Sequence, residues 1–227
     1  MLNLMFWQIT LRSGCEWTAP PLPKAVATIT PPFRSGDLPD EVGLLLPNKD
    51  SLAATLRAVE SDPEKLRDHA LGLFLADPFL NLRLEIDRLK RLGLGWVINL
   101  PSTEQQDPEF SQQLADVGLD CGLEYDRLAA CRAAGLGVIA VVADAGSARL
   151  AVAAGPSALV VMPRVADFAA GFPSFRQRGA AALAVRRAVA ETPWRGPVLT
   201  LGDKTETEHA GIWPEALDGL VRRPEPA

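Results

Sequence analysis

The stretch RAAGLGVIAVVAD, at Arg132–Asp144, decides the fold, because a short glycine joint connects the end of an amphipathic segment to a strongly apolar run. The same order recurs in RLGLGWVINLP at Arg91–Pro101 and in VAAGPSALVVMP at Val152–Pro163. Apolar runs without polar alternation are typical of strands buried on both faces, as in a parallel sheet covered by helices. The repeated unit therefore predicts an α/β fold, either a barrel or a doubly wound sheet.

The number of apolar runs favours the barrel. We expect seven strands, at residues 25–30, 71–77, 96–100, 138–143, 158–162, 197–203 and 217–221, with residues 1–9 as the candidate for an eighth. This count favours a TIM (β/α)8-type barrel that is either incomplete or built with an atypical first strand. An incomplete barrel would leave strand edges unpaired, which would favour a homo-oligomer.

Length and composition bound the domain organisation. With 227 residues, of which 48% are hydrophobic, the chain is long enough for one well-buried domain. The prolines between residues 16 and 23 indicate an extended connector. We therefore expect an N-terminal segment and proline-rich connector at residues 1–24, a barrel domain at 25–223 and a tail at 224–227.

The charge balance restricts the classes of partner. A net charge of −5 and a pI near 5.2 argue against nucleic acid and anionic membranes, because both require a positive face. Five arginines between residues 176 and 195 are interpreted as the solvated face of a basic helix. The apolar start of the chain is short for a membrane span. Three cysteines without metal-ligand spacing indicate reduced thiols and a cytoplasmic protein.

Polar residues follow several of the expected strands. In a parallel α/β barrel, the loops after the carboxyl ends of the strands form the site, because several segments converge there. The residues at these positions are Asp77, Asn99, Asp144, Arg164, Asp203 and Lys204, and Glu124 enters from the region just before its helix. Carboxylates are oxygen ligands for a divalent cation, whereas arginine and lysine bind anions.

Several of these residues also have a structural interpretation. Asp77 precedes Pro78 at an expected helix start, with Phe79 on the apolar stripe of that helix, so Asp77 is as well explained by an N-cap as by a ligand role. Asp144 and Asp203 follow strands and could cap the next helices. Asn99 favours a functional role, because an amide within an apolar run is costly unless it faces a site or a partner.

Three further motifs connect the chain to known proteins: ADPF at Ala76–Phe79, VINLPS at Val97–Ser102 and the GL..GLE segment at Gly118–Glu124. In these motifs the chain resembles the phosphoenolpyruvate hydrolase-like TIM-barrel family. The resemblance extends from Gly43 to Val221. It implies a TIM barrel that binds a small anionic metabolite, a phosphoenolpyruvate-like carboxylate.

The resemblance also implies a ligand site at the barrel rim, where Asp77, Asn99 and Glu124 occupy the matching positions. The chain also departs from the family: it has no counterpart of the glycine-rich first strand before Ala25, and the loop after the second strand is reduced to PPFRSGDLPD. Two further departures concern histidines. The family has a histidine at the end of the sixth strand, where this chain has Met162–Pro163. It has a histidine-glycine-glycine turn after the seventh strand, where this chain has Leu201–Gly202–Asp203.

Two functions therefore remain open. In an enzyme, we expect a metal-assisted lyase or hydrolase step, in which Mg²⁺ bound by Asp77 polarises the carboxylate and Glu124 or Asp144 acts as base. The ligand would then contact Asn99, Arg164, Asp203 and Lys204. The alternative is a catalytically inactive barrel that serves as a sensory or protein-interaction module.

Overall fold

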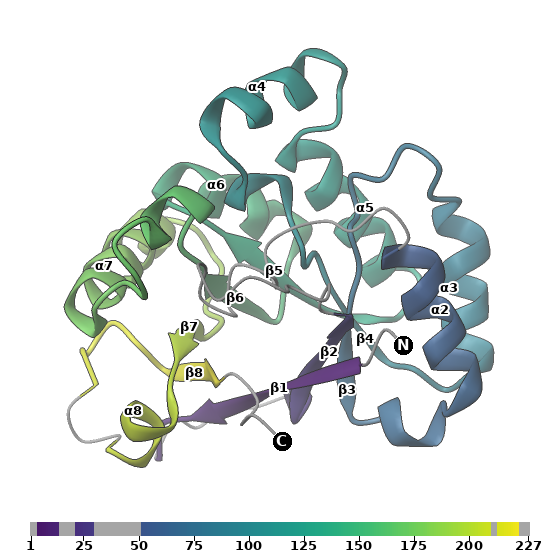
Figure 1. Cartoon of the computed structure of the whole chain (residues 1–227), viewed down its shortest axis with the longest axis horizontal. Coiled ribbons are helices and arrows are strands. Elements are labelled where there is room, and N and C mark those ends of the chain that lie inside the picture. The colour runs from purple at the N-terminus through teal and green to yellow at the C-terminus, as the bar shows by residue number, and fades with distance from the viewer. Residues whose placement is uncertain (1–3, 14–20, 30–50, 210–212, 223–227) are drawn as a thin grey trace.

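A closed barrel of eight strands forms the centre of the molecule (Figure 1). The computed structural model describes residues 4–13, 21–29, 51–209 and 213–222. Neighbours in the barrel follow the chain order, and the strands are β1 (Leu4–Leu11), β2 (Ala25–Ile29), β3 (His69–Gly72), β4 (Trp96–Ile98), β5 (Gly137–Val142), β6 (Ala158–Val161), β7 (Val198–Gly202) and β8 (Gly219–Arg222). The seven expected strands are confirmed, with shorter or shifted ends.

Strand β1 closes the barrel and runs against both of its neighbours. It pairs antiparallel with β2, with Trp7 opposite Val26, and antiparallel with β8, with Ile9 opposite Val221. All other neighbouring strands pair in parallel, so the barrel is mixed.

These pairings correct two predictions. An incomplete barrel is wrong, because β1 pairs on both sides and completes the ring. The barrel domain also does not begin at residue 25, because a strand from the expected N-terminal segment belongs to it. Closure removes the unpaired edge on which the expected homo-oligomer rested, so oligomerisation stays a prediction. The expected tail at 224–227 and part of the connector lie outside the described residues.

Helices lie between the strands from β2 onward. They are α2 (Ser51–Ser61), α3 (Leu82–Arg91), α4 (Pro108–Asp116), α5 (Cys121–Ala133), α6 (Ala145–Ala151), α7 (Phe175–Ala190) and α8 (Lys204–Glu208), with 3-10 turns η1 (Glu64–Leu66), η2 (Thr103–Gln105), η3 (Val152–Ala154) and η4 (Val165–Phe168). Helix α5 packs on β4 and β5, α6 on β5, and α7 on β6 and β7. No helix in the described ranges has both the length and the apolarity needed to cross a bilayer.

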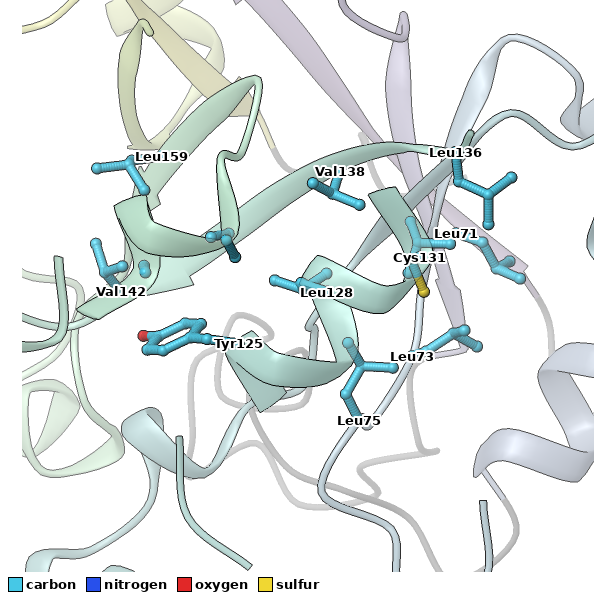
Figure 2. Packing of buried hydrophobic residues seen from close by; sticks show 14 of the residues in the cluster. Leu71, Leu73, Leu75, Tyr125, Leu128, Cys131, Leu136, Val138, Val142 and Leu159 are labelled. Carbon is cyan, nitrogen blue, oxygen red and sulfur yellow. The ribbon is translucent and has the colours of Figure 1, made fainter. Parts of the chain in front are cut away.

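Two apolar layers explain the long apolar runs of the sequence. Along β5, Val138, Ala140 and Val142 face the helices, while Ile139 and Val141 fill the barrel interior. Successive side chains of a strand point to opposite faces, so a strand that is buried on both sides needs apolar residues at every position. Figure 2 shows the outer layer, in which side chains of α5 pack against β3, β5 and the segment after β3.

The cysteines agree with the expectation of reduced thiols as far as the structure describes them. Cys121 and Cys131 are free, and Cys15 lies outside the described residues. Burial raises the pKa of the Cys131 thiol to about 11, so this side chain is a protonated member of the outer core.

Candidate functional site

Glu124 is the centre of a buried polar network beside the carboxyl end of β4. It lies in the first turn of α5, which Asp120 caps, and it is fully buried. Its carboxylate accepts hydrogen bonds from Asn99 Nδ2 at 2.9 Å, from Ser102 Oγ at 2.5 Å and from the Thr103 backbone N–H at 3.0 Å. The network therefore fixes the loop after β4 to the start of α5.

Asn99 connects this network to the neighbouring strand. Its Oδ1 accepts the Val141 backbone N–H at 2.8 Å, and the residue is fully buried. The amide thus takes a hydrogen bond that a strand backbone would otherwise supply, which explains why β4 ends at Ile98. The described partners of Asn99 are protein groups, so its expected functional role stays a prediction.

The Glu124 carboxyl holds a proton more tightly than an ordinary glutamate. Burial raises its pKa from 4.5 to about 7, because the charged form loses its hydration. The hydrogen bonds from Ser102, Asn99 and Thr103 favour the charged form and offset part of this rise. The nearby Glu104 carboxylate raises the pKa further. Near neutral pH, Glu124 therefore exchanges between its two protonation states.

Asp144 and Arg164 form a second polar group, at the ends of β5 and β6. The Arg164 Nη2 donates to Asp144 Oδ2 at 2.7 Å, and both side chains are partly exposed. Asp144 also caps α6, because its Oδ1 accepts from Gly146 N at 2.8 Å and Ser147 N at 3.1 Å. Burial opposes ionisation of Asp144, but Arg164 and these amides outweigh it and hold its pKa below the ordinary value.

Asp203 and Lys204 follow β7 at the start of the short helix α8. Asp203 is the N-cap of α8: its Oδ1 accepts from Glu206 N at 2.8 Å, and the Glu206 carboxylate accepts in return from Asp203 N at 3.1 Å. Lys204 is exposed at the first position of this helix. The structural interpretation of Asp203 therefore holds.

Asp77 belongs to the irregular segment after β3. Its Oδ1 accepts from Phe79 N at 2.8 Å, while its backbone carbonyl accepts from Arg127 Nη1 at 2.8 Å. The predicted helix start is wrong, because α3 begins at Leu82 with Asn81 as its N-cap. Phe79 is 93% exposed and is not on the apolar stripe of the helix. The Asp77 side chain therefore closes a turn in the loop after β3 and does not cap a helix.

The described residues do not form a metal site by themselves, and the expected Mg²⁺ at Asp77 stays a prediction. Across the described residues, no three histidine, cysteine, aspartate or glutamate side chains converge as metal ligands. The carboxylates of Asp77, Glu124 and Asp144 each accept hydrogen bonds from protein donors. We therefore assign no step to a metal ion.

A pocket of about 230 Å³ lies where β5, β6 and β7 end against the start of α7. Its lining includes Ala143, Met162, Pro163, Asp167, Arg178 and Thr200. Because these residues come from the carboxyl ends of neighbouring parallel strands and the loops that follow, the pocket has the position typical of a ligand site in parallel α/β folds.

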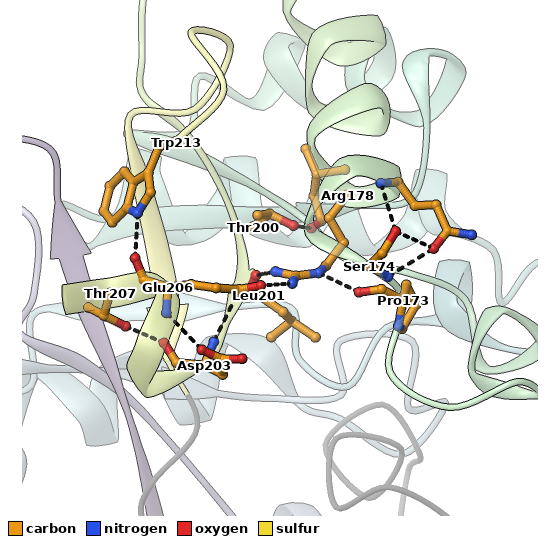
Figure 3. Close-up of polar contacts among 11 residues, drawn as sticks. Pro173, Ser174, Arg178, Thr200, Leu201, Asp203, Glu206, Thr207 and Trp213 are labelled. Carbon is orange, nitrogen blue, oxygen red and sulfur yellow. Dashed lines mark hydrogen bonds and ion pairs between the residues drawn. The ribbon is translucent and has the colours of Figure 1, made fainter. Parts of the chain in front are cut away.

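Arg178 contributes a cationic side chain to the lining of this pocket, and this side chain is almost completely buried. Its Nε donates to the Pro173 carbonyl at 2.8 Å, Nη1 donates to the Leu201 carbonyl, and Nη2 pairs with the Glu206 carboxylate (Figure 3). The aromatic rings of Phe172 and Phe175 contact the guanidinium, with centroids at 4.5 and 5.2 Å. The arginine is therefore held in one position.

Sequence reasoning missed Arg178, because it was grouped with the solvated arginines of the same helix. The spacing between Arg178 and the preceding aromatic residue already indicates that this arginine is buried. Phe175 precedes it by three residues, which places an aromatic ring on the same side of the helix. An arginine on the apolar side of an amphipathic helix indicates a buried cation, and such a group needs carbonyl or carboxylate partners.

Glu104 is the second residue that the sequence did not single out. It lies in η2, and its charge acts on both Glu124 and Arg164. Its Oε2, the Thr103 hydroxyl and both amide atoms of Gln105 are buried and have no hydrogen-bond partner among the described residues. Buried polar atoms without a partner are rare in folded proteins. The η2 turn therefore has hydrogen-bond donors and acceptors that the described residues do not satisfy.

The comparisons with known proteins leave the family open. Neither the models of known families nor the curated proteins contain a match to this chain. The resemblance described above therefore stays a prediction, and the functional argument rests on the geometry.

Proposed function

We propose that the chain binds a small carboxylic acid, of the size of phosphoenolpyruvate, in the pocket at the ends of β5, β6 and β7. We also propose that the fold is a TIM-type barrel whose first strand is reversed. Seven strands that pair in parallel, with helices between them, support the second proposal. The antiparallel β1 is then the atypical first strand.

One observation carries the proposed ligand class: a buried guanidinium lines the pocket. Arg178 has five N–H groups, and three of them donate to Pro173, Leu201 and Glu206. The two remaining N–H groups have no partner among the described residues. A carboxylate matches a planar guanidinium in geometry and charge, so it is the ligand group that would satisfy them.

The second candidate is a non-catalytic sensory or interaction barrel. It is supported by the state of the two carboxylates expected to act as bases. Glu124 is fully buried and accepts three protein hydrogen bonds, while Asp144 caps a helix and pairs with Arg164. The contacts of both side chains stabilise the fold, and neither residue is among those that line the pocket.

A thermal-shift screen tests the binding proposal. Phosphoenolpyruvate, pyruvate and oxaloacetate are added to the purified protein, each with and without Mg²⁺. A ligand at about 100 times its Kd should stabilise the folded state by about 2.7 kcal/mol and raise the Tm. If none of these acids raises the Tm at millimolar concentration, the interaction barrel becomes the better proposal.

A matched pair of variants tests whether the ligand binds in this pocket. Ala181 lines the pocket on α7, and A181L would fill part of it. Ala184 lies on the same helix but is exposed, so A184L adds the same side chain outside the pocket. We expect A181L to abolish the ligand-dependent shift and A184L to retain it. A shift that survives in A181L would move the site elsewhere.

A further inference from the structure

We propose that the ligand of this pocket is an α-amino acid with a small aliphatic side chain, whose carboxylate meets Arg178 and whose ammonium group meets Asp167. This inference rests on the proposed function, because it names the class of carboxylic acid that the pocket takes. It adds a second contact, made by another residue of the pocket lining, to the one made by Arg178.

Asp167 is an exposed aspartate that contributes to the lining of the pocket. It lies in η4, the turn that follows β6, and lines the same cavity as Arg178. Its Oδ2 accepts the Arg164 backbone N–H at 2.8 Å, which fixes the orientation of the carboxylate. Its Oδ1 has no hydrogen-bond partner among the described residues. A fixed carboxylate with one open oxygen is a suitable acceptor for an ammonium group.

The charges around the pocket favour a zwitterion over a simple anion. Glu206 already offsets the charge of Arg178, and Asp144 offsets that of Arg164. Asp167 then remains as a net negative charge in the pocket wall. An oxo acid would add a second negative charge beside Asp167, whereas the ammonium group of an amino acid would offset the charge of Asp167.

The rest of the lining favours an aliphatic side chain. Met162, Pro163, Pro173 and Ala181 contribute apolar surface to the same pocket. A pocket of about 230 Å³ is small, so it suits a compact ligand rather than a peptide or a nucleotide. L-valine therefore serves as a probe that combines both charges with a branched apolar group.

Calorimetric titration of the full chain separates the contributions of the two charged groups. The probes are L-valine, its 2-oxo acid, which lacks the ammonium group, and isobutylamine, which lacks the carboxylate. We expect L-valine to bind most tightly and its 2-oxo acid to bind roughly fivefold more weakly, the loss expected for one exposed ion pair at Asp167. Isobutylamine, which loses the contact with the buried Arg178, should bind at least roughly fivefold more weakly.

Two aspartate variants provide the residue-level test. D167N keeps an oxygen for the Arg164 amide but removes the charge, so it should weaken L-valine roughly fivefold and leave the 2-oxo acid unchanged or tighter. D126N, on the exposed side of α5, makes the same chemical change away from the pocket and should alter neither affinity.

The outcomes distinguish this inference from the proposed function. If the 2-oxo acid binds as tightly as L-valine, or if D167N does not change the preference between them, the amino-acid assignment is overturned and the carboxylic-acid proposal stands. If neither compound binds, and the thermal-shift screen also finds no ligand, both are overturned.

Discussion

The buried Glu124 makes a quantitative prediction about stability and pH. The pKa of this carboxyl is 4.5 for an ordinary glutamate, as in the unfolded chain, and about 7 in the folded protein. The folded state therefore binds the proton more tightly than the unfolded state does. The contribution of this proton to stability is therefore complete below pH 4.5 and is lost as pH rises through 7. Since each pKa unit corresponds to about 1.4 kcal/mol, the full loss is about 3 kcal/mol.

The variant E124Q isolates this contribution. Glutamine has nearly the shape of glutamate and cannot ionise, although its NH₂ group faces a site built from donors. We expect the wild type to be the more stable protein at pH 5. Its advantage over E124Q should then shrink by about 2 to 3 kcal/mol between pH 5 and pH 8, because only the wild type takes up the buried charge.

Urea unfolding followed by far-UV circular dichroism measures this difference at constant ionic strength. Other titrating groups are common to both proteins, so the difference between the two unfolding free energies reports on Glu124 alone. E109Q, at an exposed position of α4, is the control and should change the stability by less than about 0.5 kcal/mol at any pH. A wild-type advantage over E124Q that stays constant from pH 5 to pH 8 would refute the reasoning.

Four further substitutions, of which L150A is a control, probe packing and ion pairs, each read out by urea unfolding at pH 7. R178L should destabilise the fold by about 3 to 5 kcal/mol, because it leaves the mostly buried Glu206 carboxylate unpaired, and a loss below about 1 kcal/mol would contradict this. L128A should cost about 2 to 5 kcal/mol in the outer core, whereas the exposed L150A should cost less than about 0.5. R164Q removes a partly exposed ion pair and should cost no more than about 1 kcal/mol.

The sequence predicted the strands well because burial on both faces leaves a strong apolar signal, as along Val138–Val142. It did not predict the direction of β1. A strand has the same side-chain alternation in either direction, so apolar patterning carries no information about whether its neighbours run parallel or antiparallel.

The candidate site was predictable only in part. Asn99 and Glu124 are both expected at the rim. The Asn99 Nδ2 donates a hydrogen bond to Glu124 Oε2 at 2.9 Å, although 25 positions separate the two residues in sequence. Their partner Ser102 and the pocket residue Arg178 were not singled out. Hydroxyl and guanidinium groups are common on surfaces, so their burial depends on tertiary contacts that local sequence does not encode.

The antiparallel β1 also affects the order in which the barrel can form. Gln8 and Arg222 are 214 positions apart, yet their side chains are hydrogen-bonded across β1 and β8. During synthesis, β1 and β2 can pair early as neighbours in sequence, but the other edge of β1 stays open until β8 has emerged. Closure is thus among the most non-local steps available to this chain, which predicts slow folding and an aggregation-prone late intermediate with one exposed strand edge.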